Sequence, residues 1–174
     1  MRIAIAYYSY TGNTKKVAEI LEEYLRNKGE VDIIRLTDLQ ESGNFFTQAT
    51  QALRHLKADI LEVNFDLSAY DTIYFGTPVW AFGPAPALNA YMDKCFGLEA
   101  KSVVLFATYG SGTGRKRCFN YMRKILSGKG AKQFRQFSIQ QFAVNDREFV
   151  LGKIEYALSL PPNEYLPGNR QGAL

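Results

Sequence analysis

Residues 1–36 most constrain how this chain can fold, because they contain a complete strand, helix and strand. Residues 2–8 are a short, almost uninterrupted apolar run, which is typical of a strand buried on both faces. Apolar residues then recur at helical spacing up to Gly29, and residues 31–36 have the pattern of a second strand. A unit of this kind predicts a right-handed crossover and a parallel pair of strands.

The same alternation continues along the chain. Three more strands are expected, at residues 72–76, 102–107 and 134–142. Four more helices are expected, at about 44–58, after Pro84 and Pro86, at 115–126 and at 146–158. The last strand partly alternates and is expected at an edge, and residues 60–66 are expected to be an extended linker. Five strands that alternate with helices predict an α/β fold, a three-layer α/β/α sandwich.

Length and composition are those of one folded domain. The chain has 174 residues, of which 47% are hydrophobic, enough to bury a sizeable core. We expect a domain at residues 1–160 and a polar tail at 161–174, which is either disordered or clasps a partner subunit. No apolar run approaches the length of a membrane span, and no secretory signal is recognised. Cys95 and Cys118, both among apolar neighbours, favour a reduced, cytoplasmic location.

The net charge of +4 is unevenly distributed. Residues 101–141 contain nine Lys and Arg and no Asp or Glu, so this stretch carries +9 and the remainder carries −5. Such asymmetry is consistent with a surface for an anionic ligand or partner, or with a solvated helix face. No nucleic-acid motif accompanies the charge, and no metal site is expected from two cysteines and one histidine, His55.

A hydroxyl-rich turn follows the first strand and precedes the first helix. It consists of Ser9, Tyr10, Thr11, Gly12, Asn13 and Thr14. The helix start offers unpaired N–H groups and the positive end of the helix dipole, to which the side chains add hydroxyl and amide donors. Since no Lys or Arg lies inside the turn, we expect it to hold a phosphate monoester rather than to transfer one. The alternative is an ordinary helix cap, where the same residue types are common.

Two other loops are expected at the same edge, because ligands of such sheets bind at the carboxyl ends of the strands. The loop after the third strand offers Pro78, Val79, Trp80, Ala81 and Phe82. The loop after the fourth strand offers Thr108, Tyr109, Gly110, Ser111 and Gly112. Aromatic side chains and free glycine backbone suit a planar aromatic ligand that carries one phosphate. The alternatives are a core or lid role for Trp80 and a plug of the loop for Tyr109.

The Thr-Gly-Asn-Thr core of the first turn resembles the FMN-phosphate loop of the flavodoxin family. Residues 76–80 and 107–110 resemble the second and third flavin loops of flavodoxin-like proteins, in the same order and at similar spacing. The resemblance implies a flavodoxin-like FMN-binding domain with strand order 2-1-3-4-5. It also implies that residues 9–14 bind the FMN phosphate, while residues 78–82 and 108–112 surround the isoalloxazine ring.

Three hypotheses for function follow. The first is an FMN-binding electron-transfer protein that works with a redox partner protein. The alternative is an FMN-dependent NAD(P)H oxidoreductase that acts on quinones or similar acceptors, and the third is a non-redox interaction module. Carrier flavodoxins are usually acidic around the flavin, whereas Arg115, Lys116 and Arg117 stand close to the expected flavin edge here and would attract NADPH or an acidic partner. No catalytic residue is expected, and the chain is either a monomer or a homodimer.

Overall fold

The structure, a computed structural model, describes residues 1–38 and 60–164. The helix expected at about 44–58, with His55, and the tail from residue 165 onward lie outside the described residues. Residues 61–65 are in neither a helix nor a strand, which confirms the expected linker over that range. Within the described ranges, no helix is long and apolar enough to cross a membrane.

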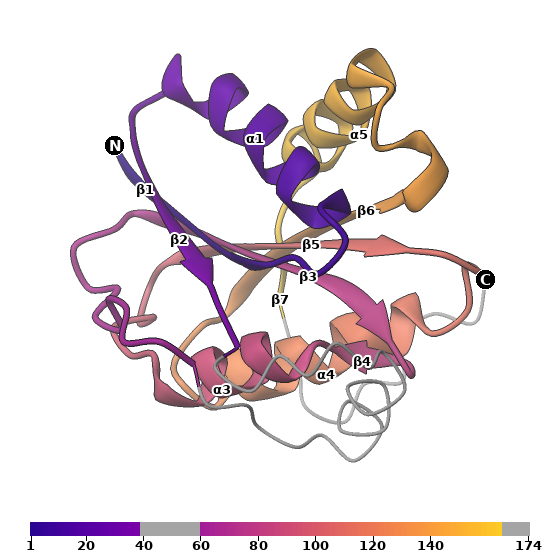
Figure 1. Cartoon of the computed structure of the whole chain (residues 1–174). Coiled ribbons are helices and arrows are strands. Elements are labelled where there is room, and N and C mark those ends of the chain that lie inside the picture. The colour runs from indigo at the N-terminus through magenta and orange to yellow at the C-terminus, as the bar shows by residue number, and fades with distance from the viewer. Residues whose placement is uncertain (39–59, 165–174) are drawn as a thin grey trace.

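A sheet of five parallel strands runs through the molecule (Figure 1). They are β1 (Arg2–Tyr8), β2 (Glu30–Leu36), β3 (Thr72–Trp80), β5 (Ser102–Tyr109) and β6 (Gln133–Gln140). Their order in the sheet is β2-β1-β3-β5-β6, and all four neighbouring pairs are parallel. This is the predicted order 2-1-3-4-5, so the prediction of a doubly wound α/β sheet is confirmed.

Within residues 1–38 and 60–164, two helices cover each face of the sheet (Figure 1). On one face lie α1 (Asn13–Arg26) and α5 (Arg147–Ser159), and on the other lie α3 (Pro86–Lys94) and α4 (Arg115–Ser127). Because successive side chains of a strand point to opposite faces, β1 contributes to both cores. Ile3 and Ile5 pack beneath α1 and α5, whereas Ala4 and Ala6 pack on the side of α3 and α4. The sheet therefore has a layer of helices on both faces, as the predicted α/β/α sandwich requires.

Two short antiparallel strands extend the predicted pattern. The first, β4 (Gly83–Pro84), folds back on the end of β3, and the second, β7 (Asn163–Glu164), pairs with the start of β6. Among the described residues, the last long strand is flanked only at its amino end, so the rest of it lies at an edge of the sheet, as expected. The strand ends earlier than expected, since Phe142 lies in the 3₁₀ turn η1 (Gln141–Ala143) and is 79% exposed.

The chain leaves α3 sooner than its apolar spacing predicts. The apolar spacing of residues 85–96 predicts a helix with Phe96 on its buried side, but Phe96 follows the helix end and is 55% exposed. Its N–H donates to the carbonyl of Phe65, and its own carbonyl accepts from the N–H of Leu67. These backbone bonds to the preceding linker compete successfully with another helical turn, and they turn the Phe96 side chain outward.

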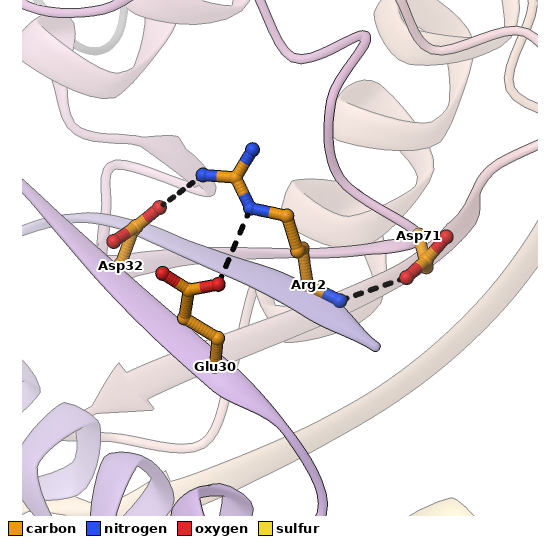
Figure 2. Close-up of polar contacts among 4 residues, drawn as sticks. All are labelled: Arg2, Glu30, Asp32 and Asp71. Atoms are coloured by element: carbon orange, nitrogen blue, oxygen red, sulfur yellow. Dashed lines mark hydrogen bonds and ion pairs between the residues drawn. The ribbon is translucent and has the colours of Figure 1, made fainter.

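A charged cluster ties together the amino ends of the first three strands. Figure 2 shows the Arg2 guanidinium between two carboxylates, 3.6 Å from Glu30 Oε2 and 3.3 Å from Asp32 Oδ2. The backbone N–H of Arg2 donates to Asp71 Oδ2 over 2.7 Å. All these side chains are exposed, so each ion pair contributes less than about 1 kcal/mol. The cluster lies at the edge opposite the three predicted loops, where it fixes the strand starts.

Candidate functional site

The three predicted loops meet at one edge of the sheet, where β1, β3 and β5 end (on the right in Figure 1). The first and second loops touch through Tyr10 and Trp80, whose ring centroids are 5.7 Å apart. The first and third are joined by a hydrogen bond of 2.8 Å between the hydroxyls of Thr14 and Thr108. The second and third meet where Phe82 packs against Gly114. Each loop therefore contacts both others.

The first loop leaves the start of α1 open. Gly12 is the N-cap residue, with φ of +87°, and because glycine has no side chain it cannot cap the N–H groups of the first turn. The first turn contains no acidic residue, so nothing there neutralises the positive end of the helix dipole. A side chain built at Gly12 would meet no atom within 4 Å, which shows that the space beside it is empty. This geometry suits an anion.

Polar side chains surround this helix start. The hydroxyl oxygen of Ser9 is buried and has no hydrogen-bond partner among the described residues. Asn13 donates its amide to the hydroxyl of Thr11 over 3.2 Å, and the Thr11 side chain is exposed. A buried hydroxyl without a partner is costly, so a ligand atom beside Ser9 would relieve this cost at the start of α1.

Thr14 and Thr108, two of the residues expected to bind the cofactor, contact each other in the structure. Both are almost completely buried, and their hydroxyls bond to each other. They fix the first turn of α1 against the end of β5, beneath the loops. The structure therefore places them as supports of the site, with their side-chain hydroxyls already paired.

The second predicted loop is mostly strand. Pro78, Val79 and Trp80 are the last residues of β3, and only Ala81 and Phe82 form a turn before β4. Trp80 is 7% exposed and makes edge-on contacts with Tyr8 and Tyr10 at 5.8 and 5.7 Å. Its indole belongs to the buried core on the side of α3 and α4. The position of Trp80 agrees with the alternative given above, in which its indole packs in the core.

The turn at Ala81 and Phe82 is strained. Both residues have positive φ, 45° and 69°, a combination that tight hairpins require and that usually selects Gly or Asn. Phe82 is 44% exposed, and the Arg117 guanidinium lies 6.0 Å from its ring centroid. The turn thus presents an aromatic ring to solvent beside the start of α4. Non-glycine residues held in this conformation concentrate at ligand sites.

Two long polar side chains donate hydrogen bonds to the backbone of the third loop. Arg115 stacks over Tyr109 at 4.3 Å from the ring centroid and donates from Nε to the carbonyl of Gly112 over 3.0 Å. Gln140 donates to the carbonyl of Gly110 over 3.1 Å. Ser111 is exposed, and its hydroxyl bonds to that of Thr113. The loop is therefore positioned by Arg115 and Gln140 together.

Some residues that position the site were not expected from the sequence. Thr77 is buried, and its hydroxyl accepts a bond of 2.9 Å from the N–H of Ala85, which fixes the β3–β4 hairpin. From β6, Gln140 reaches the third loop, and Ser138 accepts a bond from Arg115 at the start of α4. The alternation along β6 places Ser138 and Gln140 on one face, which is the signal available in the sequence. Their approach to the site depends on sheet order and side-chain reach.

Together these features form a site for a flat, anionic ligand. The start of α1 and Ser9 offer donors for an anion, and Phe82 and Tyr109 offer aromatic surface beside it. The start of α4 adds three cations, Arg115, Lys116 and Arg117, with no acidic residue in its first turn. The rim of the site is therefore positive. Its parts fit a phosphate ester that carries a planar ring.

The chain is similar to proteins whose descriptions name FMN or flavodoxin. A family model described as NADPH-dependent FMN reductase matches residues 1–144. A flavodoxin from Clostridium saccharobutylicum is 26% identical over 116 residues, which are 66% of this chain and 59% of the flavodoxin. The match thus spans less than two thirds of that relative.

Solved structures share the fold at low identity. A flavoprotein from Lactobacillus acidophilus in complex with FMN superposes with a TM-score of 0.62 and 21% identity, covering 84% of this chain and 98% of that one. The apo form of an NADH:FMN oxidoreductase gives a TM-score of 0.60 and 19% identity, covering 92% of this chain and 90% of the other.

Proposed function

Because the chain belongs to the family of NADPH-dependent FMN reductases, we propose that it is an NAD(P)H-dependent oxidoreductase that reduces quinones or similar acceptors through FMN. The expected relationship to flavodoxin-like proteins is confirmed, and FMN is the cofactor. When bound, the flavin supplies the redox chemistry, and the protein supplies binding, orientation and charge. The identity of the electron donor and of the acceptor belongs to the proposal.

The first loop would hold the FMN phosphate. The uncapped N–H groups at the start of α1 would donate to the phosphate oxygens, and Thr11 and Asn13 would add side-chain donors. The buried hydroxyl of Ser9, which has no partner, would gain one. Gly12 lets the backbone approach closely, because no side chain fills the empty space beside it.

The second and third loops would hold the ring. Phe82, Tyr109 and the backbone at Gly110, Ser111 and Gly112 are the groups that remain accessible at the rim. Trp80, Thr14 and Thr108 would act from beneath, by keeping the loops in place. The first domain, expected at residues 1–160, would thus carry the whole flavin site.

The observation that favours a reductase is the positive rim. Arg115, Lys116 and Arg117 occupy the first turn of α4, beside the third loop, and attract phosphates at the approach to the ring. A pyridine nucleotide carries such phosphates. A carrier that exchanges electrons with a protein partner is the second candidate, and the similarity to a flavodoxin favours it.

Anaerobic reduction tests the proposal. NADPH, then NADH, is added to FMN-loaded protein while the absorbance of oxidised flavin is followed. We expect rapid, saturable bleaching. Arg117→Gln should slow it several-fold at low nucleotide concentration, whereas Lys124→Gln, near the other end of the same helix, should not. If dithionite reduces the flavin but neither nucleotide does, the proposed reductase activity is contradicted and an electron carrier is supported.

A further inference from the structure

A cavity of about 280 Å³ lies beside the third loop, along the outer side of β6. Tyr109 and Arg115 form its end nearest the three loops, and α5 forms its opposite wall with Phe149, Lys153 and Tyr156. The cavity therefore begins where the proposed flavin site ends. None of the functional assignments above uses it.

The cavity exists because β6 is only partly covered. Among the described residues, β7 pairs only with Gln133 and Phe134, so the outer side of β6 from residue 135 to 140 has no neighbouring strand. Gln136, Ser138 and Gln140 approach from one face of β6, and Phe137 approaches from the other. The cavity thus curves around the strand and is lined by both polar and aromatic side chains.

The lining combines positive charge with aromatic surface. Arg115 and Lys153 are cations, and none of the described residues that line the cavity is Asp or Glu. Tyr156 is 66% exposed, and Lys153 Nζ lies 5.3 Å from the ring centroid of Phe149. A lining of this kind suits a planar aromatic group that carries phosphate. Phe149 is 43% exposed as well, so both aromatic side chains of α5 are accessible to a ligand in the cavity.

Arg115 is already held in a fixed position. It stacks on Tyr109, donates from Nε to Gly112, and donates from Nη1 to the hydroxyl of Ser138 over 3.4 Å. Since a guanidinium has five N–H donors, several remain for an anion. An anion that binds there does not have to order a flexible side chain. Arg115 also joins the cavity to the third loop, so a ligand in the cavity lies next to the flavin site.

We propose that this cavity binds the adenosine-phosphate end of NADPH. The adenine lies against the aromatic side chains of α5, and the phosphates meet Lys153 and Arg115. The nicotinamide end then extends past Tyr109 toward the flavin site. This inference rests on the proposed function, because it takes the nucleotide as the electron donor.

Calorimetry with adenosine 2′,5′-bisphosphate on FMN-loaded protein tests the assignment without any turnover. We expect binding that Lys153→Ala weakens about three- to tenfold, as for a partly exposed ion pair. Lys153→Arg should keep most of the affinity, and Lys124→Ala, which removes an exposed cation outside the cavity, should leave it unchanged. Tyr156→Ala should weaken both the bisphosphate and plain adenosine, whereas Lys153→Ala should affect only the bisphosphate.

The outcomes separate this inference from the proposed function. If NADPH bleaches the flavin but the bisphosphate does not bind, or binds equally well to Lys153→Ala and Tyr156→Ala, the cavity is not the nucleotide site and the reductase stands. If the bisphosphate binds with the expected dependence but NADPH does not bleach the flavin, the cavity is a nucleotide site and the reductase is wrong.

Discussion

Gly12 begins α1 with φ of +87°, a backbone conformation that costs side chains with a Cβ atom roughly 1–2 kcal/mol. Because a Cβ there would meet no atom within 4 Å, the Gly12→Ala variant isolates that conformational cost. We expect a loss of about 1 kcal/mol in the free energy of unfolding and weaker FMN binding, measured by urea denaturation and fluorescence titration.

Gly152 provides the matched control. It lies inside α5, its φ is not in the left-handed region, and a Cβ there would also meet nothing. Gly152→Ala should stabilise the protein by about 0.5–1 kcal/mol and leave FMN affinity unchanged. Equal stability changes for the two variants would contradict the role given to the Gly12 conformation.

A substitution at Ser9 should change FMN affinity without lowering the free energy of unfolding. Its buried hydroxyl has no partner, so Ser9→Ala should leave the stability of the FMN-free protein unchanged or slightly higher. The same change should weaken FMN binding about tenfold, because it removes a donor to the phosphate. Titration of FMN fluorescence measures this loss.

Ser127 is the control for Ser9. Its hydroxyl is also buried without a partner, but it lies in the last turn of α4, away from the first loop. Ser127→Ala should therefore behave like Ser9→Ala in denaturation and like the unchanged protein in FMN binding. Unaltered FMN affinity in Ser9→Ala would remove Ser9 from the phosphate site.

At the scale of helices and strands, apolar spacing predicted most elements. The five long strands and the order of helices between them follow from buried runs such as residues 2–8 and 102–107. The continuation of β3 through Pro78 was missed. Proline has no N–H to donate to a neighbouring strand, so it usually indicates the end of a strand. The β4 hairpin was missed as well. It depends on Ala81 and Phe82 in a conformation that their residue types do not predict.

Burial of thiols on one face of the sheet predicts a dependence of stability on alkaline pH. Cys95 follows α3 and Cys118 lies in α4, and both are fully buried. Burial raises the pKa of each thiol from about 9 to about 12. Burial also raises the pKa of Tyr91, the large aromatic residue of α3.

The sign follows from these raised pKa values. Above pH 9 the thiols of the unfolded chain lose protons, while those of the folded chain keep them. The free energy of unfolding should therefore fall as pH rises above 9, by up to about 1.4 kcal/mol per pH unit for each thiol. Urea denaturation between pH 8 and 10.5 measures the fall. Cys118→Ala should show a shallower decline, and an unchanged slope would contradict the assignment.

At the scale of the whole molecule, sheet order brought the three loops together as predicted, since parallel strands place their carboxyl ends at one edge. What could not be predicted is the detailed division of roles. Thr14 and Thr108 pair with each other across 94 residues of sequence, and Trp80 turns into the core. Such choices depend on packing between distant segments, which periodicity within one element does not contain.

The uneven charge predicts a salt dependence for the reaction with NADPH. The nine cations of residues 101–141 include Arg115, Lys116 and Arg117 at the site rim. Screening shortens the reach of these charges to roughly 8–10 Å near physiological salt. The second-order rate constant for flavin reduction by NADPH should fall several-fold as salt rises, whereas photochemical reduction should not change. A rate independent of salt would exclude steering by this rim.

The strand order also bears on how the protein is made. After β1 and β2 pair, β3 joins the free side of β1, and β5 and β6 then each join the outer side of the long strand translated before them. A nascent chain can therefore build its sheet outward in one direction as it leaves the ribosome, without inserting a strand between two already paired. The third loop and its supports, Arg115 and Gln140, emerge after the other two loops. The three-loop site is therefore complete only after β6, the last of the long strands, has been translated.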